Sequence, residues 1–355
     1  MNPIKVLIVD DSNLVRTVLT EILKTQNDIE VVGAANDPYE AREMIKTLEP
    51  DVLTLDIEMP KMDGITFLKN LMRLKPMPVV MLSTLTAKGA EATLMAMELG
   101  AVDFIQKPGQ TGANMLKGEF LEELTTKIRA AFLAKKHIQR KGQASPSVSL
   151  APKPKREAIH LAPTSRGQLV AIGSSTGGTE ALFELLTALP TGMPPIVIAQ
   201  HIPQTFSARF AERLDKRCEL TIKEAQHAEV LQASHVYIAQ GGKHLKVKRQ
   251  GGVLKCFIED SEPVNRHKPS VEALFDSLIP LELSSLTALM LTGMGADGAE
   301  AMLRLKNHGA MTIAQDEESS LIWGMPGSAV KLGAAKKVLP LPRMADALIK
   351  HLTAS

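Results

Sequence analysis

The sequence has few or none of the features that mark disulfide-rich, metal-binding, secreted or membrane-spanning proteins. The 355 residues include only two cysteines, Cys218 and Cys256, with no CxxC spacing and no metal-like cluster around them. No secretory signal precedes Lys5, and no apolar run approaches the roughly 18 residues of a membrane span. We therefore expect a cytoplasmic protein with two core thiols and no direct membrane insertion.

An excess of charge of one sign is also missing. The formal net charge is +2, with 23% charged and 45% hydrophobic residues, which is typical of a globular protein. Neither nucleic acid nor a membrane surface is favoured by such a balance, and a basic recognition helix is absent. We expect no nucleic-acid partner, disfavour a DNA-binding output domain, and take a monomer as the default state.

The hydrophobic pattern predicts two α/β domains joined by a linker. Residues 1–137 alternate amphipathic segments with the β-branched runs "KVLIVD", "IEVVGAA", "DVLTLDI", "PVVMLS" and "VDFIQKP". Five such units imply a doubly wound, flavodoxin-like parallel sheet. Residues 138–166 are rich in Pro, Ser and Lys/Arg without an apolar period, which indicates a tether.

A second alternating series fills residues 167–355, with the runs "QLVAIG", "PPIVIAQ", "SLTALML", "AMTIAQ" and "KKVLPL". It predicts a second doubly wound parallel sheet in a three-layer α/β domain. Residues 219–260 are strand-rich and contain the turns "QGGKHL" and "RQGGVL". This stretch favours a β-hairpin elaboration over further βα units.

Carboxylates follow two strands of the N-terminal domain. Asp10 and Asp11 come after the first strand and Asp56 after the third, so all three meet at one edge of the sheet. Crowded carboxylates repel one another and call for a hard divalent cation such as Mg²⁺. With the metal bound, Asp56 is a candidate nucleophile toward a phosphoryl group. For Asp11 alone, an ordinary helix N-cap is an equal alternative.

Two further strand ends carry Ser83 with Thr84, and Lys107. Together with "VDDS", "LDIEMPKMDG" and "KP", these residues resemble the response-regulator receiver domain. The resemblance implies that Asp56 accepts a phosphoryl group and that Ser83 and Lys107 sense it. Thr84 stays open as the switch hydroxyl, because receivers usually have one Ser or Thr where this chain has "ST". The implied Mg²⁺ ligands are Asp10 or Asp11, Asp56 and the backbone carbonyl of Glu58.

The strand "QLVAIG" runs into "SSTGGTE" and then a helix. Gly173 to Gly178 spells G-x-x-x-x-G, but a phosphate-binding loop would continue with Lys and then Ser or Thr, whereas Thr179 and Glu180 follow. A turn of the nucleophile-elbow kind survives, with Ser175 as the nucleophile and helix N–H groups, near Thr176, for an oxyanion.

Such a serine needs a base, and His201 directly follows the strand "IVIAQ". No other histidine of the nine is so placed: His244 lies in a Gly-rich turn, and His308 lies near a helix C-terminus, where a cap explains it. Taken alone, His201 has an equally good interpretation as a structural residue.

The stretch "LTGMGADG", residues 291–298, has two interpretations. Its glycines spell the dinucleotide fingerprint G-x-G-x-x-G, and acidic residues 316–318 follow at the spacing that a ribose contact needs. Against a nucleotide, Asp297 would stand inside the anion-binding turn, and the motif comes late in its domain. We favour a triad in the order Ser175, His201, Asp297, with a backbone N–H near Met294 in the oxyanion hole.

The second domain resembles the chemotaxis-receptor glutamate methylesterases, a family in which a receiver is fused to an esterase. The motifs in question are "AIGSSTGGTEAL", "QHIP", "EPVNRHKPSVEALF", "MLTGMGADGA" and "WGMPGSAV". The resemblance implies Ser175 as nucleophile, His201 as base and Asp297 as its orienting carboxylate, with no cofactor for the esterase and Mg²⁺ for receiver phosphorylation. Ser174 departs from the family, which more often has Ala there.

The same resemblance implies the biological setting. The expected substrates are glutamate methyl esters on the cytoplasmic helices of methylated chemoreceptors, with deamidation of specific receptor glutamines as a second activity. A histidine kinase of the chemotaxis pathway would supply the phosphoryl group, and a bacterial cytoplasmic enzyme would be recruited to membrane receptor arrays.

Two hypotheses concern substrate and control. Arg266 and Lys268 in the basic stretch "NRHKPS" would hold acidic receptor helices, although a solvated loop is as good an explanation. The unphosphorylated receiver would cover the Ser175 cleft, and phosphorylation of Asp56 would release it. A binding module without catalysis, in which the Ser/His/Asp set is a coincidence, is the competing class.

Overall fold

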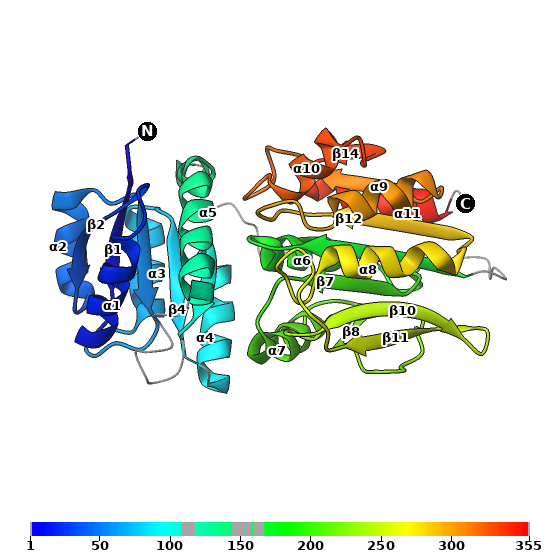
Figure 1. Cartoon of the computed structure of the whole chain (residues 1–355), viewed down its shortest axis with the longest axis horizontal. Helices are drawn as coiled ribbons and strands as arrows, with labels where there is room; N and C mark the ends of the chain where they lie inside the picture. The colour runs from blue at the N-terminus through cyan, green and yellow to red at the C-terminus, as the bar shows by residue number, and fades with distance from the viewer. Residues whose placement is uncertain (1, 85, 108–117, 144–157, 159–166, 354–355) are drawn as a thin grey trace. The chain divides into compact units, whose positions relative to one another are not determined.

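The computed structural model describes residues 2–84, 86–107, 118–143, 158 and 167–353 (Figure 1). The chain separates into two units, Met1–Leu150 and Ala151–Ser355. Each unit is built on a parallel sheet, which confirms the predicted fold class of two α/β domains. Among the described residues, no helix is both long enough and apolar enough to cross a membrane.

The N-terminal unit holds a five-stranded parallel sheet in the order β2-β1-β3-β4-β5. Its central strands are buried on both faces, which explains their nearly continuous apolar sequence. The strands are β1 (Ile4–Val9), β2 (Ile29–Ala35), β3 (Val52–Asp56), β4 (Val79–Ser83) and β5 (Asp103–Gln106). The helices are α1 (Asn13–Leu23), α2 (Pro38–Leu48), α3 (Gly64–Leu74), α4 (Ala87–Glu98) and α5 (Gly118–Gln143).

Side-chain caps start the helices of this unit close to the strand ends. Ser12 accepts the Val15 N–H before α1, and Asp37, Asp63 and Thr86 cap α2, α3 and α4 in the same way. The boundary predicted at residue 137 falls inside α5, which continues to Gln143. The tether predicted for residues 138–166 lies otherwise almost wholly outside the described residues and stays a prediction.

The C-terminal unit holds a seven-stranded sheet in the order β14-β13-β12-β6-β7-β9-β8, with every pairing parallel. Its strands are β6 (Gln168–Ser174), β7 (Ile196–Gln200), β8 (Thr221–Glu224), β9 (His235–Ile238), β12 (Ser285–Met290), β13 (Met311–Gln315) and β14 (Lys337–Leu339). Its helices are α6 (Gly178–Leu186), α7 (Gln204–Asp215), α8 (Val271–Leu278), α9 (Ala299–Asn307), α10 (Met325–Lys331) and α11 (Leu341–Thr353), with the short 3₁₀ helix η2 (Ile279–Leu281).

Two layers of helices sandwich this sheet. On one face, Leu169 and Ala171 of β6 join a core built with α8, α9, α10 and the β10–β11 hairpin. Their neighbours Val170 and Ile172 are also fully buried and, by the two-residue period of a strand, point to the other face. Helices α6 and α11 pack against each other there. Cys256 belongs to the core as expected, whereas Cys218 is only partly buried.

Residues 219–260 contain the predicted hairpin and two strands of the main parallel sheet. Strands β10 (His244–Gln250) and β11 (Val253–Glu259) pair antiparallel as a separate two-stranded sheet. However, β8 and β9 do not belong to a hairpin: they extend the main sheet in parallel, with β9 paired to β7 and β8 at the edge. Strand propensity marks a segment as extended but does not choose its partner, so the sequence did not distinguish the two arrangements.

Gly64, the first residue of α3, lets that helix start against the end of β3. A Cβ at this position would lie 2.0 Å from the Asp56 carbonyl oxygen, a backbone atom that cannot move aside. We expect Gly64→Ala to lower the free energy of unfolding of the N-terminal unit by about 3 kcal/mol through overpacking. Urea unfolding, monitored through the hydrogen exchange of the β3 amides, measures this change.

Gly118→Ala is the matched control, because Gly118 is the first residue of α5 and has open space where a Cβ would lie. Equal effects of the two substitutions would contradict the steric account and point to helix propensity alone.

Candidate functional site

A sharp turn between β6 and α6 carries Ser175. The Ser175 N–H donates to the Thr292 carbonyl at 3.0 Å, and the Ser175 carbonyl accepts from the Gly178 N–H at 2.7 Å. Gly177 has a φ of 76°, and a Cβ there would lie 2.8 Å from Leu321. A side chain at this position would be both strained and crowded, so the glycine permits the turn that leaves Ser175 partly exposed at the carboxyl edge of the sheet.

The structure brings His201 and Asp297 to this serine. His201 directly follows β7, and its N–H donates to the Ser174 carbonyl on the neighbouring strand at 3.1 Å. Its Nδ1 lies 3.0 Å from Ser175 Oγ, and its Nε2 lies 2.9 Å from Asp297 Oδ2. Three residues that are far apart in the sequence therefore form one continuous hydrogen-bonded chain.

Asp297 is a buried anion held by many donors. Its residue is 3% exposed, and its carboxylate faces the N-terminus of α8. Burial alone would raise its pKa, but hydrogen bonds from His201, Asn265 and the Val271 backbone lower the pKa to about 2. The donors are His201 Nε2 and the Val271 N–H (2.7 Å) on Oδ2, and Asn265 Nδ2 (2.9 Å), Ser270 Oγ (2.8 Å) and the Glu272 N–H (3.3 Å) on Oδ1.

This charge fixes the tautomer of His201. An ionised carboxylate can only accept, so the ring proton of neutral His201 belongs on Nε2, facing Asp297. Nδ1 then carries a lone pair and accepts from the Ser175 hydroxyl at 3.0 Å. This geometry is the one that a base for Ser175 requires, with the usual positions of the two ring nitrogens exchanged.

The loop of "LTGMGADG" packs directly against Ser175. A Cβ on Gly293 would lie 2.8 Å from Ser175 Cβ, so only glycine fits. The Gly293 carbonyl accepts from the N–H groups of Gly324 and Met325, at 3.1 and 2.8 Å. In a trans peptide the N–H points opposite to the carbonyl. The Met294 N–H, which shares a peptide with the Gly293 carbonyl, is therefore directed away from Gly324 and Met325. In the other turn, the Thr176 carbonyl accepts from Thr292 Oγ1 at 3.0 Å.

The same geometry weakens the dinucleotide interpretation of this loop. Asp297 places a buried negative charge in the turn where a pyrophosphate would have to bind, and its donors are already committed. His308 is the C-cap of α9, with Nδ1 2.8 Å from the Arg304 carbonyl, as expected for a capping residue. The buried His244 contacts the Ser270 N–H and the Glu262 carbonyl, and so has a structural role.

Ser174 and Ser175 lie in different environments. Ser174 is fully buried and donates to Gln200 Oε1 at 2.7 Å. Gln200 in turn donates from Nε2 to the carbonyls of Ser175 and His201, both at 3.0 Å. The hydroxyl of Ser174 thus has a structural role. Gln200, which was not predicted from the sequence, links the ends of β6 and β7, the strands that precede Ser175 and His201.

The loop "NRHKPS" contributes more than the two cations predicted from it. Asn265 donates to Asp297, and the His267 ring stacks on His201 with centroids 3.7 Å apart and planes 14° apart. Neither contact was predicted, although both residues lie in that motif. Lys268 Nζ pairs with Asp260 Oδ1 at 2.5 Å, so this cation already has a carboxylate partner. Arg266 is exposed in the turn between Asn265 and His267.

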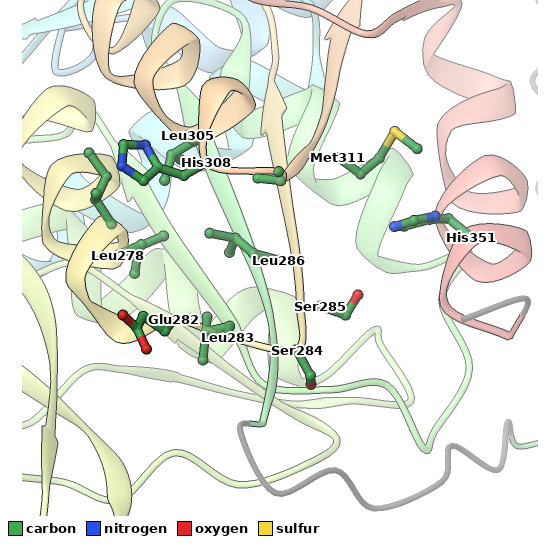
Figure 2. Close-up of a pocket in the computed structure, with 13 residues that line it drawn as sticks. Leu278, Glu282, Leu283, Ser284, Ser285, Leu286, Leu305, His308, Met311 and His351 are labelled. Atoms are coloured by element: carbon green, nitrogen blue, oxygen red, sulfur yellow. The ribbon is translucent and has the colours of Figure 1, made fainter.

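A cavity of about 290 Å³ lies elsewhere in this unit (Figure 2). It is lined by Ser285 and Leu286 at the start of β12, Met311 at the start of β13, and His308 and His351 from neighbouring segments. The triad follows the carboxyl ends of the strands, whereas this cavity adjoins their amino ends. Its lining does not include Ser175, His201 or Asp297.

In the N-terminal unit, Lys107 bridges two of the predicted carboxylates. Its Nζ lies 2.7 Å from Asp10 Oδ2 and 2.8 Å from Asp56 Oδ2. Asp10 and Asp56 are buried and Asp11 is exposed, yet one carboxylate oxygen from each lies within 4.8 Å of the others. Four of the strand-end residues, Asp10, Asp11, Asp56 and Lys107, are therefore near one another, and the three carboxylates offer the oxygen donors that suit a hard divalent cation.

The surroundings of Asp56 disfavour the charged form of its carboxyl group. Burial raises its pKa to about 6, aided by the charge of Asp10 and opposed by Lys107 and the Glu58 backbone N–H. Its Oδ1 atom is buried without a hydrogen-bond partner within the described part of the chain. An orphaned, buried carboxylate oxygen is what a metal ligand and phosphoryl acceptor would present.

Ser83 and Thr84 differ in what they contact. Ser83 is fully buried, and its Oγ lies 2.7 Å from Thr93 Oγ1 and 3.3 Å from the Gly89 carbonyl, both on α4. Thr84 is partly exposed and contacts Thr86 Oγ1 at 3.4 Å. The Ser83 carbonyl also accepts the Lys107 N–H at 2.7 Å. Ser83 therefore contacts α4 through its side chain and, through its backbone carbonyl, Lys107, the residue that pairs with Asp10 and Asp56.

Fold and sites together define a receiver-type domain joined to an α/β domain with serine-hydrolase geometry. A model of the family described as CheB methylesterase matches residues 170–348, and one described as response regulator receiver domain matches residues 6–116. The chain belongs to the CheB methylesterase family, which confirms the resemblance drawn from its motifs.

Individual relatives cover nearly the whole chain. A Vibrio vulnificus protein named protein-glutamate methylesterase/protein-glutamine glutaminase 2 is 51% identical over 350 residues, with 98% of each chain covered. A protein of the same name from Saccharophagus degradans is 50% identical over 354 residues, with 99% of each covered. The crystal structure of the Thermotoga maritima CheB methylesterase catalytic domain matches with a TM-score of 0.51 at 39% identity, covering 52% of this chain and 98% of that chain.

The raised pKa of Asp56 makes a stability prediction for the Mg²⁺-free protein. Between the unfolded value of 3.8 and the folded value of about 6, the folded unit binds the extra proton, so its stability falls as the pH rises through this window. We expect Asp56→Asn to raise the free energy of unfolding at pH 7 by up to about 3 kcal/mol, and to have little effect near pH 3.5.

Urea unfolding in the presence of a chelator, at both pH values, measures the difference. Asp11→Asn controls for the change of net charge at an exposed position. A gain for Asp56→Asn that is the same at both pH values would contradict the account.

Proposed function

We propose that this protein is a phosphorylation-activated serine hydrolase that removes methyl groups from glutamate side chains of chemoreceptors. The observation that carries the proposal is the continuous chain from Ser175 Oγ through His201 to Asp297, with contacts of 3.0 and 2.9 Å. The names of the relatives that match along the whole chain support the substrate class.

The chemistry is acyl transfer. Ser175 Oγ attacks the ester carbonyl while His201 Nδ1 accepts the hydroxyl proton, and Asp297 stabilises the imidazolium through Nε2. The N–H groups of Met294 and Thr176 are the proposed oxyanion donors, because both belong to turns that contact Ser175. His201 then returns the proton to departing methanol, and the acyl-enzyme remains.

A water molecule, deprotonated by the same nitrogen, releases the free glutamate and regenerates Ser175. The same steps act on a glutamine amide, with ammonia leaving in place of methanol, so we propose deamidation of receptor glutamines at the same site. The glutaminase part of the relatives' name supports this second activity. Neither reaction requires a cofactor.

We propose that Asp56 accepts a phosphoryl group from a histidine kinase of the chemotaxis pathway. Asp10 or Asp11, Asp56 and the Glu58 carbonyl are the proposed ligands of Mg²⁺, which would neutralise charge on the transferred group. Lys107, already 2.8 Å from Asp56, would pair with the resulting acyl phosphate. The buried, unpartnered Asp56 Oδ1 supports this assignment.

Control of the esterase is proposed to run through Ser83 in preference to Thr84. A phosphoryl group on Asp56 would draw the Ser83 hydroxyl from its Thr93 and Gly89 contacts and so move α4. We keep the hypothesis that the unphosphorylated receiver blocks the Ser175 cleft and that phosphorylation releases it. Arg266 and Lys268 remain the residues proposed to bind acidic receptor helices, and Lys268 would have to exchange its Asp260 partner for a receptor carboxylate.

Methanol release from a methylated receptor fragment tests the proposal. Ser175→Ala is expected to lower the rate by at least about 10⁴-fold, because it removes the nucleophile. Ser174→Ala is the matched control: it changes a neighbouring buried serine that does not contact His201 or Asp297, so activity per folded molecule is expected to stay within about threefold. Because Gln200 Oε1 loses its donor, the free energy of unfolding should fall by about 1–3 kcal/mol. Full activity of Ser175→Ala would remove Ser175 from the reaction, whereas no methanol release from wild type would favour a binding module without catalysis.

The Ser83–Thr93 hydrogen bond predicts a change in activation. Thr93→Val removes a contact worth about 1 kcal/mol to the inactive state, so half-maximal activation is expected at about fivefold lower concentration of a small-molecule phosphodonor with Mg²⁺. Thr125→Val is the control, since Thr125 is also buried in a helix and donates to the carbonyl four residues earlier. An unchanged activation curve for Thr93→Val would remove Thr93 from the switch.

A further inference from the structure

The face of the His201 ring is covered by a second imidazole. His267 stacks on it with a centroid distance of 3.7 Å and an interplanar angle of 14°. His201 is otherwise held at its edges, at Nδ1 by Ser175 and at Nε2 by Asp297. Two edge contacts define an axis through the ring and do little to oppose rotation about that axis. A ring packed on the face does oppose it.

The turn that delivers His267 is short and unusual. Val264 and His267 exchange two backbone hydrogen bonds, of 3.1 and 2.9 Å, so Asn265 and Arg266 are the two central residues of a tight turn. Both have positive φ, 52° and 67°, although neither is glycine. Such a turn persists only where its surroundings hold it.

This turn holds two members of the triad at once. Asn265 donates to Asp297 Oδ1 at 2.9 Å, and His267, two residues later, covers His201. The base and its orienting carboxylate are thus fixed relative to each other by one rigid segment, in addition to their mutual hydrogen bond.

We propose that His267 is a positioning residue that sets the orientation of the His201 ring, through the aromatic face and not through proton transfer. The proposal rests on the serine-hydrolase chemistry proposed above. His267 acts on the reacting atoms only through His201: it prevents the ring from turning about the axis of its two edge contacts, and so keeps the Nδ1 lone pair directed at Ser175 Oγ. Any flat aromatic side chain at this position should therefore serve.

The test uses full-length protein with two substitutions. His267→Ala removes the ring, and His267→Phe keeps a ring but removes its nitrogens. A fluorophosphonate probe that labels Ser175 gives the folded, competent fraction from its final amplitude and the reactivity of Ser175 from its rate. Methanol release from a methylated receptor fragment then gives kcat per competent site together with KM.

A misplaced base costs on the order of 10–100-fold in rate, so we expect His267→Ala to lower kcat and the labelling rate by about that factor, with His267→Phe within about threefold of wild type. KM should be unchanged in both. His235→Ala is the matched control, because His235 stacks on Tyr237 at the start of β9, at the opposite edge of the sheet from Ser175.

Three outcomes would overturn the inference. Unchanged kcat per labelled site in His267→Ala would give the stack no positioning role, and loss of rate in His267→Phe as large as in His267→Ala would assign the effect to the ring nitrogens. A lower labelling amplitude with a normal rate would make His267 structural only. If wild type is active but Ser175→Ala is equally active, the proposed function fails instead, whatever His267 does.

Discussion

A buried carboxylate organises the C-terminal unit. Asp297 is removed from water yet remains charged, because donors from the α8 N-terminus, from Asn265 and from His201 surround it. Leaving any of these donors unpaired in the interior would be costly, so the loop after β12, the tight turn and the start of α8 are all tied to one anion. As a consequence of that constraint, the His201 ring between Asp297 and Ser175 has a defined tautomer, which the proposed role as a base requires.

The contrast with Asp56 shows how environment divides one residue type into two roles. Both side chains are buried at the carboxyl end of a parallel strand. Asp297 has its oxygens satisfied, which lowers its pKa to about 2 and suits a permanent orienting charge. Asp56 has one oxygen without a partner and Asp10 beside it, and its pKa rises to about 6. A site with unsatisfied charge is suited to accept a metal and a phosphoryl group.

Much of this arrangement could be predicted from the sequence, because parallel sheets gather strand ends at one edge. The βα alternation places Ser175, His201 and Asp297 at one edge of their sheet, and Asp56 and Lys107 at one edge of theirs. Which of these strands are neighbours depends on the strand order, which the alternation does not fix. Asn265 and His267 could not be found in this way, since they act through a turn with two positive-φ residues that no sequence pattern announces. The pairing of β8 with β9 and of Lys268 with Asp260 likewise depends on tertiary packing.

The tautomer of His201 tests the central claim most directly. We would record ¹⁵N NMR spectra of histidine-labelled protein at a pH where the ring is neutral, with His201→Gln to assign the signal. The account predicts a proton on Nε2, facing Asp297, and an unprotonated Nδ1 facing Ser175. A proton on Nδ1 would contradict it, because Asp297 would then not hold the base in the form that can accept the Ser175 proton.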